Sequence, residues 1–126
     1  MVEKPTPCPC GAMGYAACCG RYHGGAPAPD AAALMRSRYS AYALGLEAYL
    51  LATWHPDTRP VALNLAADGT KWLGLELKRH TPESADSATV EFVARYKTGA
   101  RAQRLHEISR FVREEGRWFY VDGTFP

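Results

Sequence analysis

All four cysteines of the 126-residue chain lie in one short stretch, CPCGAMGYAACCG, residues 8–20. A single proline separates Cys8 from Cys10, and Cys18 is adjacent to Cys19. A tetrahedral zinc site takes four thiolate or imidazole ligands, and two close pairs joined by a short loop supply them. Iron is the alternative, because thiolates suit both metals. The spacing therefore predicts a metal site formed by these four thiols.

Other interpretations of the cysteines are less favourable. A disulfide between Cys18 and Cys19 would be strained, because neighbouring Cα atoms lie about 3.8 Å apart and disulfides prefer about 5.5 to 6 Å. A redox centre more often has the spacing C-x-x-C, which this stretch lacks. His23 follows Cys19 closely and could replace one thiolate. The sequence leaves open whether Cys19 or His23 is the fourth ligand.

Length and composition are those of an ordinary globular chain. The hydrophobic fraction of 47% and the charged fraction of 22% exclude a disordered or fibrous protein. The net charge of +2 gives no general argument for binding nucleic acid or membrane. No apolar run approaches the roughly 20 residues of a membrane span, and the N-terminus lacks the apolar core of a signal peptide. We therefore expect a cytoplasmic protein, where reducing conditions favour metal binding over disulfides.

Several longer strings resemble a known family. The cysteine stretch looks like the SEC-C motif, the small metal-binding tail of the protein-export ATPase SecA. Its combination with LMRSRYSAY, TWHPDTRP, KWLGLEL and SRFVREEGRWFYVDG resembles the YchJ family of bacterial proteins. That resemblance implies an N-terminal metal motif followed by a cystatin-like α+β domain of the nuclear-transport-factor superfamily, folded as a curved cone.

The resemblance also implies which side chains hold the metal, namely Cys8, Cys10, Cys18 and Cys19, with Cys19 standing where SecA-type motifs have histidine. The loop between the pairs departs from the family pattern. It usually reads Gly-Ser-Gly-Lys and has one more residue, whereas here it is Gly-Ala-Met-Gly, residues 11–14. The departure removes a lysine that could contact a partner, and it leaves the four ligands intact.

Periodicity predicts helices first and strands afterwards. Asp30 is the expected N-cap of a helix over residues 31–44, and Gly45 separates it from a second short helix over residues 47–54. Pro56 ends that second helix. Alternating apolar and polar residues between turn signals then predict four strands, over residues 71–80, 88–98, 102–114 and 116–123.

We therefore predict an α+β fold in which the helices pack on one face of an antiparallel sheet. A metal knuckle occupies residues 1–25, and the α+β domain occupies residues 26–126. Prolines and glycines mark residues 21–30 as a linker between them. Because of this linker we expect the apolar core to lie beyond it, so that loss of the metal would leave the domain folded.

The superfamily resemblance implies a pocket between helices and sheet, because some members are isomerases or dehydratases that use a buried carboxylate or histidine. General acid–base chemistry would need a polar group there with a pKa moved towards neutrality. His106 and Glu107 are neighbours on a strand and therefore point to opposite faces. Arg36 and Arg38 project on different faces of the first helix, so one of them could reach a buried carboxylate such as Glu76 or Glu107. The remaining candidate pocket residues are Arg36, Tyr39, Trp54, His55 and Arg59.

Two classes of function stay open. The first is a metal-binding interaction module for a protein or ribosome-associated partner in protein export or translation. The second is a small-molecule binder or an enzyme of the isomerase or dehydratase kind. We favour the first, because no nucleophile, paired carboxylate or phosphate loop accompanies the cysteine motif. Six basic residues against one acid between Arg95 and Arg113 could meet RNA, but a solvated hairpin edge is the preferred interpretation.

Overall fold

The computed structural model describes residues 7–12, 14–65 and 69–126. Its helices are η1 (Tyr15–Ala17), a single 3₁₀ turn, followed by α1 (Cys19–His23), α2 (Ala31–Leu44) and α3 (Glu47–Ala52). Its strands are β1 (Thr70–Pro82), β2 (Ser87–Thr98), β3 (Arg101–Glu114) and β4 (Arg117–Thr124). Met13 of the predicted metal loop and residues 1–6 of the predicted knuckle lie outside the described residues. The predicted helix over residues 31–44 and the four predicted strands are confirmed, whereas the second predicted helix ends at Ala52 and not at residue 54. Sequence reasoning did not predict η1 or α1, and α1 extends into the predicted linker.

Local chemistry sets both ends of α2. The Asp30 carboxylate accepts a hydrogen bond from the backbone N–H of Ala33 at 2.7 Å, which satisfies one of the free donors of the first turn. Gly45 ends the helix in the left-handed conformation with φ of 74°, which glycine adopts at little cost. Leu46 is the N-cap of α3, which begins at the next residue.

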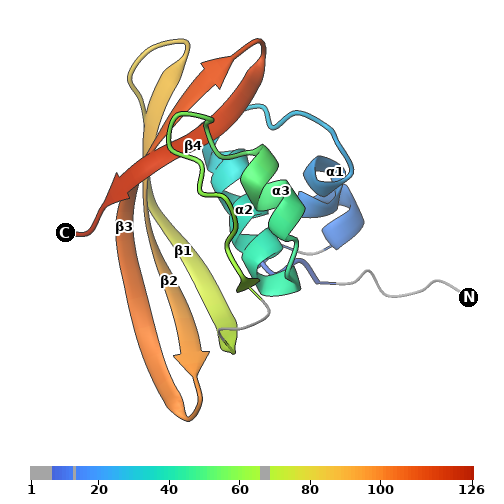
Figure 1. The fold of residues 1–126 in the computed structure, drawn as a ribbon, viewed down its shortest axis with the longest axis vertical. Coiled ribbons are helices and arrows are strands. Elements are labelled where there is room, and N and C mark those ends of the chain that lie inside the picture. Colours follow the sequence, from blue (N-terminus) through green and yellow to red (C-terminus); the bar gives the residue numbers. More distant parts are fainter. Residues whose placement is uncertain (1–6, 13, 66–68) are drawn as a thin grey trace, which may run out of the picture.

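The sheet is antiparallel with strand order β1-β2-β3-β4. Val90, Phe92 and Ala94 alternate along β2 and are buried, so one face of the sheet lies on the core. Register shifts interrupt the pairing of β1 with β2 and of β3 with β4. Such bulges bend strands and increase their twist. The curvature that the resemblance implies is visible in Figure 1.

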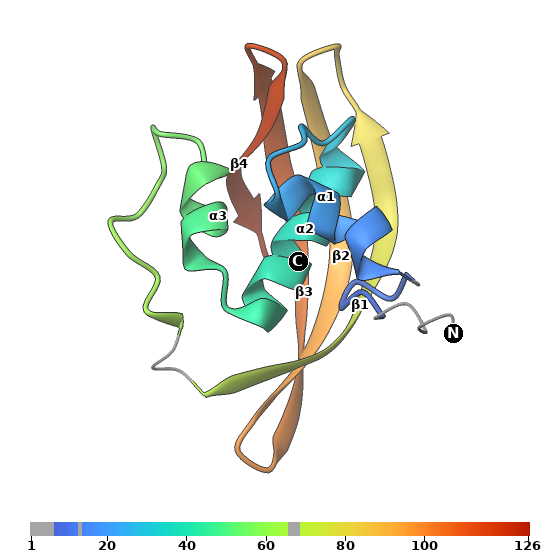
Figure 2. The same cartoon turned by 90° about the vertical axis from the view of Figure 1, so that its right-hand side faces the viewer.

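Three layers follow one another through the molecule. Helices α2 and α3 cover one face of the sheet, and the N-terminal segment with α1 lies on the side of α2 away from the sheet (Figures 1 and 2). The β2–β3 hairpin extends past the ends of the helices (Figure 1). Helix α2 is therefore enclosed on two sides.

The expectation that the core begins after the linker is wrong. Cys8, Cys10 and Cys19 are buried in the same cluster as Leu34 and Tyr39 of α2. The physical reason is that α1 packs along α2 and brings the small apolar thiols against it. The domain boundary at residues 25 and 26 stays a prediction, but both segments share one core. Within the part of the chain that the structure describes, no helix is long and apolar enough to span a bilayer.

Candidate functional site

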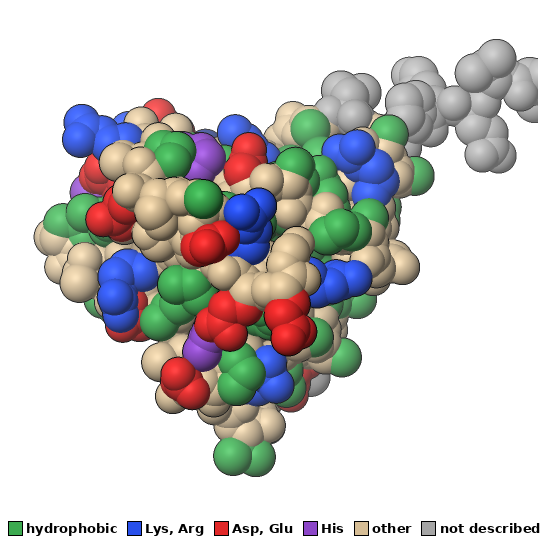
Figure 3. Space-filling view, turned by 90° about the horizontal axis from the view of Figure 1, so that it is seen from above, with side chains coloured by type: hydrophobic (Ala, Val, Ile, Leu, Met, Phe, Trp, Pro, Cys, Tyr) green, Lys and Arg blue, Asp and Glu red, His purple; other side chains and the backbone are tan. Residues whose placement is uncertain are grey.

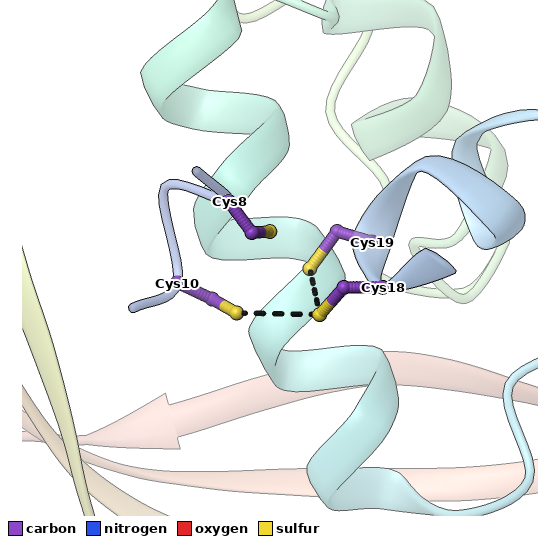
Figure 4. Close-up of side chains that lie close together, drawn as sticks. All are labelled: Cys8, Cys10, Cys18 and Cys19. Carbon is purple, nitrogen blue, oxygen red and sulfur yellow. Dashed lines mark hydrogen bonds between the residues drawn. The ribbon is translucent and has the colours of Figure 1, made fainter. Parts of the chain in front are cut away.

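The four cysteine sulfurs converge on one point. All of them lie within 4.8 Å of one another. The Cys10 and Cys18 sulfurs are 3.7 Å apart, and those of Cys18 and Cys19 are 3.9 Å apart (Figure 4). Zn–S bonds of about 2.3 Å in a tetrahedron separate the sulfurs by about 3.8 Å. The donor set and its spacing therefore fit a tetrahedral metal ion.

Two short turns bring the cysteine pairs together. The first closes when the backbone N–H of Gly11 donates to the Cys8 carbonyl at 3.0 Å, and that of Cys8 donates to the Ala12 carbonyl at 2.9 Å. Gly11 has a φ of 107°, a conformation that glycine adopts at little steric cost. The second pair follows η1 directly: Cys18 lies between η1 and α1, and Cys19 is the first residue of α1. Each pair thus sits on a compact turn of backbone.

Burial and hydrogen bonding divide the thiols. Burial raises the pKa of Cys10 to about 11 and also raises that of Cys19. Burial alone would raise the pKa of Cys8 too. Hydrogen bonds from the Ser40 side chain and from backbone N–H groups outweigh it and lower that pKa to about 6. The cluster therefore carries one thiolate readily, that of Cys8. Further thiolates in this buried site would need a bound cation to balance their negative charge.

His23 lies beside the cluster with both ring nitrogens engaged. Its Nε2 donates to the Ser37 carbonyl at 2.8 Å, so Nδ1 accepts the hydroxyl of Tyr15 at 2.5 Å. The ring also packs edge-on against Tyr49. These contacts tie α1 to α2 and leave neither nitrogen free for a metal. We therefore propose Cys19 rather than His23 as the fourth ligand.

One edge of the cysteine cluster faces solvent. Cys18 is half-buried, unlike the three other cysteines. It lines a surface hollow of about 300 Å³ together with Cys19, Asp30 and two exposed arginines, Arg21 and Arg36. Arg21 also donates from Nε to the Cys18 carbonyl at 3.2 Å. The hollow combines the metal loop with positive charge.

A second feature is a partly open cavity of about 210 Å³ between α2 and the sheet. Tyr39 and Glu107 are the two predicted pocket residues that line it, and Arg38 lines it as well. Sequence reasoning missed Tyr42, Trp72, Ser109 and Tyr120. Two of these follow from spacing: Ser109 is two residues after Glu107 on a strand, and Tyr42 is one helical turn after Arg38.

The other predicted pocket residues lie elsewhere. His106 points away from the helices and bonds Glu91 at 2.7 Å, which confirms that His106 and Glu107 lie on opposite faces. His55 bonds Glu114 at 2.5 Å. Arg59 is exposed and donates to the Trp54 carbonyl at 2.9 Å. None of these, nor Arg36, is among the residues that line the cavity. Trp54 is near it, because its ring stacks edge-on against Tyr120.

The cavity holds two buried charges. The Glu107 carboxylate accepts at Oε2 from the hydroxyls of Ser109 at 2.5 Å and Tyr120 at 3.0 Å. Arg38 donates from Nη1 to the Leu50 carbonyl at 2.8 Å and to the Thr53 hydroxyl at 2.7 Å. Burial lowers the pKa of Arg38 and raises that of Tyr120, so Tyr120 stays a hydroxyl donor.

The basic stretch of β2 and β3 is partly neutralised. Arg110 pairs with Asp122 through two bonds of 2.6 and 2.7 Å, and Arg113 pairs with Asp86 at 3.0 Å. At the end of the molecule that carries the β1–β2 and β3–β4 turns, acidic and basic side chains are interspersed (Figure 3). That face has no field of one sign, and it lies at the opposite end of the molecule from the β2–β3 turn (Figures 1 and 3).

A cysteine cluster packed on a curved α+β domain is the architecture of SEC-C motif proteins with a domain like nuclear transport factor 2. A SEC-C motif containing protein from Rhodopseudomonas palustris has this fold in solution, with a TM-score of 0.84 and 32% identity over 96% of this chain and 99% of that one. A crystal structure of a SEC-C motif containing protein from Psychrobacter arcticus aligns with a TM-score of 0.81 and 33% identity, over 100% of this chain and 86% of that one.

Sequence comparison gives the particular family. Residues 30–123 match the model of the YchJ middle NTF2-like domain. A UPF0225 protein of Chromobacterium violaceum is 64% identical over 92% of this chain and 90% of its own length. One from Methylibium petroleiphilum is 59% identical over 96% and 90%. The chain belongs to the YchJ family, which confirms the resemblance.

Proposed function

We propose that the protein binds one zinc ion through Cys8, Cys10, Cys18 and Cys19 and that the folded metal loop is a docking module for a protein partner. The observation that carries the proposal is the convergence of four sulfurs within 4.8 Å of one another. Bound zinc would supply four coordination bonds that join the first turn to the start of α1. Zinc is proposed over iron because a closed set of four cysteines on tight turns is typical of structural zinc sites.

The hollow beside Cys18 supports the docking role. Arg21 and Arg36 are exposed at its rim, so an acidic segment of a partner would meet two positive charges next to the metal loop. The cysteine stretch resembles the SEC-C motif of SecA, which suggests that such a partner acts in protein export or on the ribosome. The site then works by presenting a rigid surface, with no reaction at the metal.

Metal analysis tests the first half of the proposal. Protein purified without added metal should contain about one zinc per chain. Cys10→Ser should lose it, because Cys10 contributes one of the converging sulfurs. His23→Gln is the matched control and should keep it. A folded protein with four free thiols and no metal would overturn the zinc site, and metal loss in His23→Gln would overturn the choice of Cys19.

Crosslinking tests the second half separately. Tagged protein carrying a photo-crosslinker at Ala32, a residue of the hollow, should capture the same partner from native extract in the parent and in His23→Gln. Arg36→Glu should lose the partner while keeping its zinc, because Arg36 lines the hollow without belonging to the sulfur cluster. Equal capture by Arg36→Glu would remove the hollow as the docking surface and leave the zinc site standing.

A further inference from the structure

The cavity between α2 and the sheet carries an inference that goes beyond the metal loop. It takes side chains from the helix and from every strand of the sheet. Met35, Trp72, Phe92, Ala94 and Leu105 give it an apolar body. Its volume of about 210 Å³ exceeds the about 150 Å³ cavity that binds benzene in an engineered protein core. There is room for a substituted aromatic ring.

Two buried charged side chains, Arg38 and Glu107, line the cavity. Arg38 is 3% exposed and Glu107 is 7% exposed. No direct ion pair joins these two described residues, although the Glu107 charge acts on the Arg38 guanidinium and favours its protonated form. Arg38 instead lies over the rings of Trp54 and Tyr120, at 5.1 and 4.7 Å from their centres. Burying two charges that do not pair is costly, and apolar residues of similar size would be as stable or more so. Stability alone therefore does not account for them.

The carboxylate of Glu107 is held with one oxygen open. Its hydrogen bonds from Ser109 and Tyr120 both go to Oε2, and among the described residues Oε1 has no hydrogen-bond partner. Gly123 makes room for this arrangement, because a methyl group at that position would overlap the carboxylate. The surrounding chain thus fixes an acceptor oxygen at the wall of an apolar cavity.

We propose that this cavity binds a small neutral molecule with a flat apolar body and one hydroxyl donor, which hydrogen-bonds to Oε1 of Glu107. A phenol or an alcohol of similar size has this chemistry. The apolar body lies among Trp72, Phe92 and Met35. Anionic ligands are disfavoured, because they would face the Glu107 carboxylate. Binding of this kind is independent of the proposed zinc site.

Three para-substituted toluenes test the proposal, of which p-cresol and p-xylene have the same shape. With labelled, zinc-containing protein, p-cresol should shift the backbone amide signals of residues 105–109 and the indole signal of Trp72. It should bind about tenfold or more tightly than p-xylene, since a hydrogen bond to a charged acceptor adds about that much. p-Toluate should bind more weakly than p-cresol.

Variants separate the hydrogen bond from the cavity itself. Glu107→Gln should reduce the preference for p-cresol over p-xylene to a few-fold or less. Glu91→Gln, on the opposite face of the sheet, is the matched control and should keep it. Ala94→Leu should fill the space and weaken both probes, and it replaces Glu107→Gln if that variant does not fold.

Three results would overturn the proposal. The first is the absence of shifts at the cavity residues up to the solubility limit of p-cresol. The second is equal binding of p-cresol and p-xylene. The third is a tighter complex with p-toluate, which would make Arg38 rather than Glu107 the recognising group.

Discussion

Individual side chains around the cysteine cluster affect how it would bind a metal. Ser40 of α2 lies 3.5 Å from the sulfur of Cys8 and contributes to the thiolate at that position. The sequence shows the four thiols but does not show this neighbour, which comes from a helix far along the chain. The same is true of His23, whose hydrogen bonds to Tyr15 and Ser37 depend on the fold.

Proton release should report this arrangement. The pKa of Cys8 is lowered from 9.0 to about 6 in the folded chain, so its thiolate is already formed above that pH. Adding zinc to refolded metal-free protein at about pH 7.5 should therefore release fewer protons than the four ligands would carry as thiols. As the pH falls through about 6, Cys8 gains its proton, release rises and affinity falls. Weakly buffered calorimetry measures the count, and release of all four at the higher pH would contradict it.

Gly123→Ala should destabilise the fold by about 1 to 3 kcal/mol, because the added methyl group overlaps the Glu107 side chain, which would have to move within its buried site. Urea unfolding gives the difference. In a Glu107→Ala background the same change should cost much less. An equal cost in both backgrounds would show that the carboxylate is not what Gly123 accommodates.

At the scale of elements, the sequence predicted α2, α3 and the four strands in their order, with bounds close to those observed, but it did not predict η1 or α1. Capping and turn signals such as Asp30 and Gly45 act locally, and strand alternation reports one buried face, so both can be read from neighbouring residues. The cavity could not be predicted in full. Its lining combines α2 with all strands, and the bulges in β1 and β4 that set their alignment leave no clear sequence pattern. Tyr120 in particular gave no signal of contact with Glu107.

Asp30→Ala should lower the free energy of unfolding by about 0.5 to 2 kcal/mol, because the first turn of α2 loses the acceptor for the Ala33 N–H. Denaturant unfolding followed by circular dichroism measures this. Glu83→Ala, an exposed acid in the β1–β2 turn, is the control and should have little effect. Equal losses in the two variants would argue against the cap.

At the scale of the whole molecule, the metal loop and the sheet domain are one packed unit. Cys8, Cys10 and Cys19 share a cluster with residues of α2, β2, β3 and β4. A linker rich in proline and glycine suggested two separate parts, because composition reports chain flexibility and says nothing of what the ends of the linker pack against. The cytoplasmic location and the partner stay predictions.

Removing the metal ligands should therefore weaken the entire fold. We expect Cys10→Ser to lower the free energy of unfolding by more than about 2 kcal/mol, because it disturbs a buried cluster and removes a ligand together. Calorimetry should show a single transition at lower temperature. An unchanged main transition with loss of the metal alone would mean that the loop is energetically separate from the sheet.

Helix α2 lies between the N-terminal segment and the sheet, and eight of its fourteen residues are buried. An ordinary surface helix has one solvent-exposed face on which substitutions are tolerated, and tolerance along the helix therefore varies with a period of about 3.6 residues. Here Ser37 and Ser40 are as enclosed as Leu34. Saturation mutagenesis of this helix should consequently lack the usual periodic variation in tolerance. Tolerant positions should be confined to exposed ones such as Arg36 and Ala43.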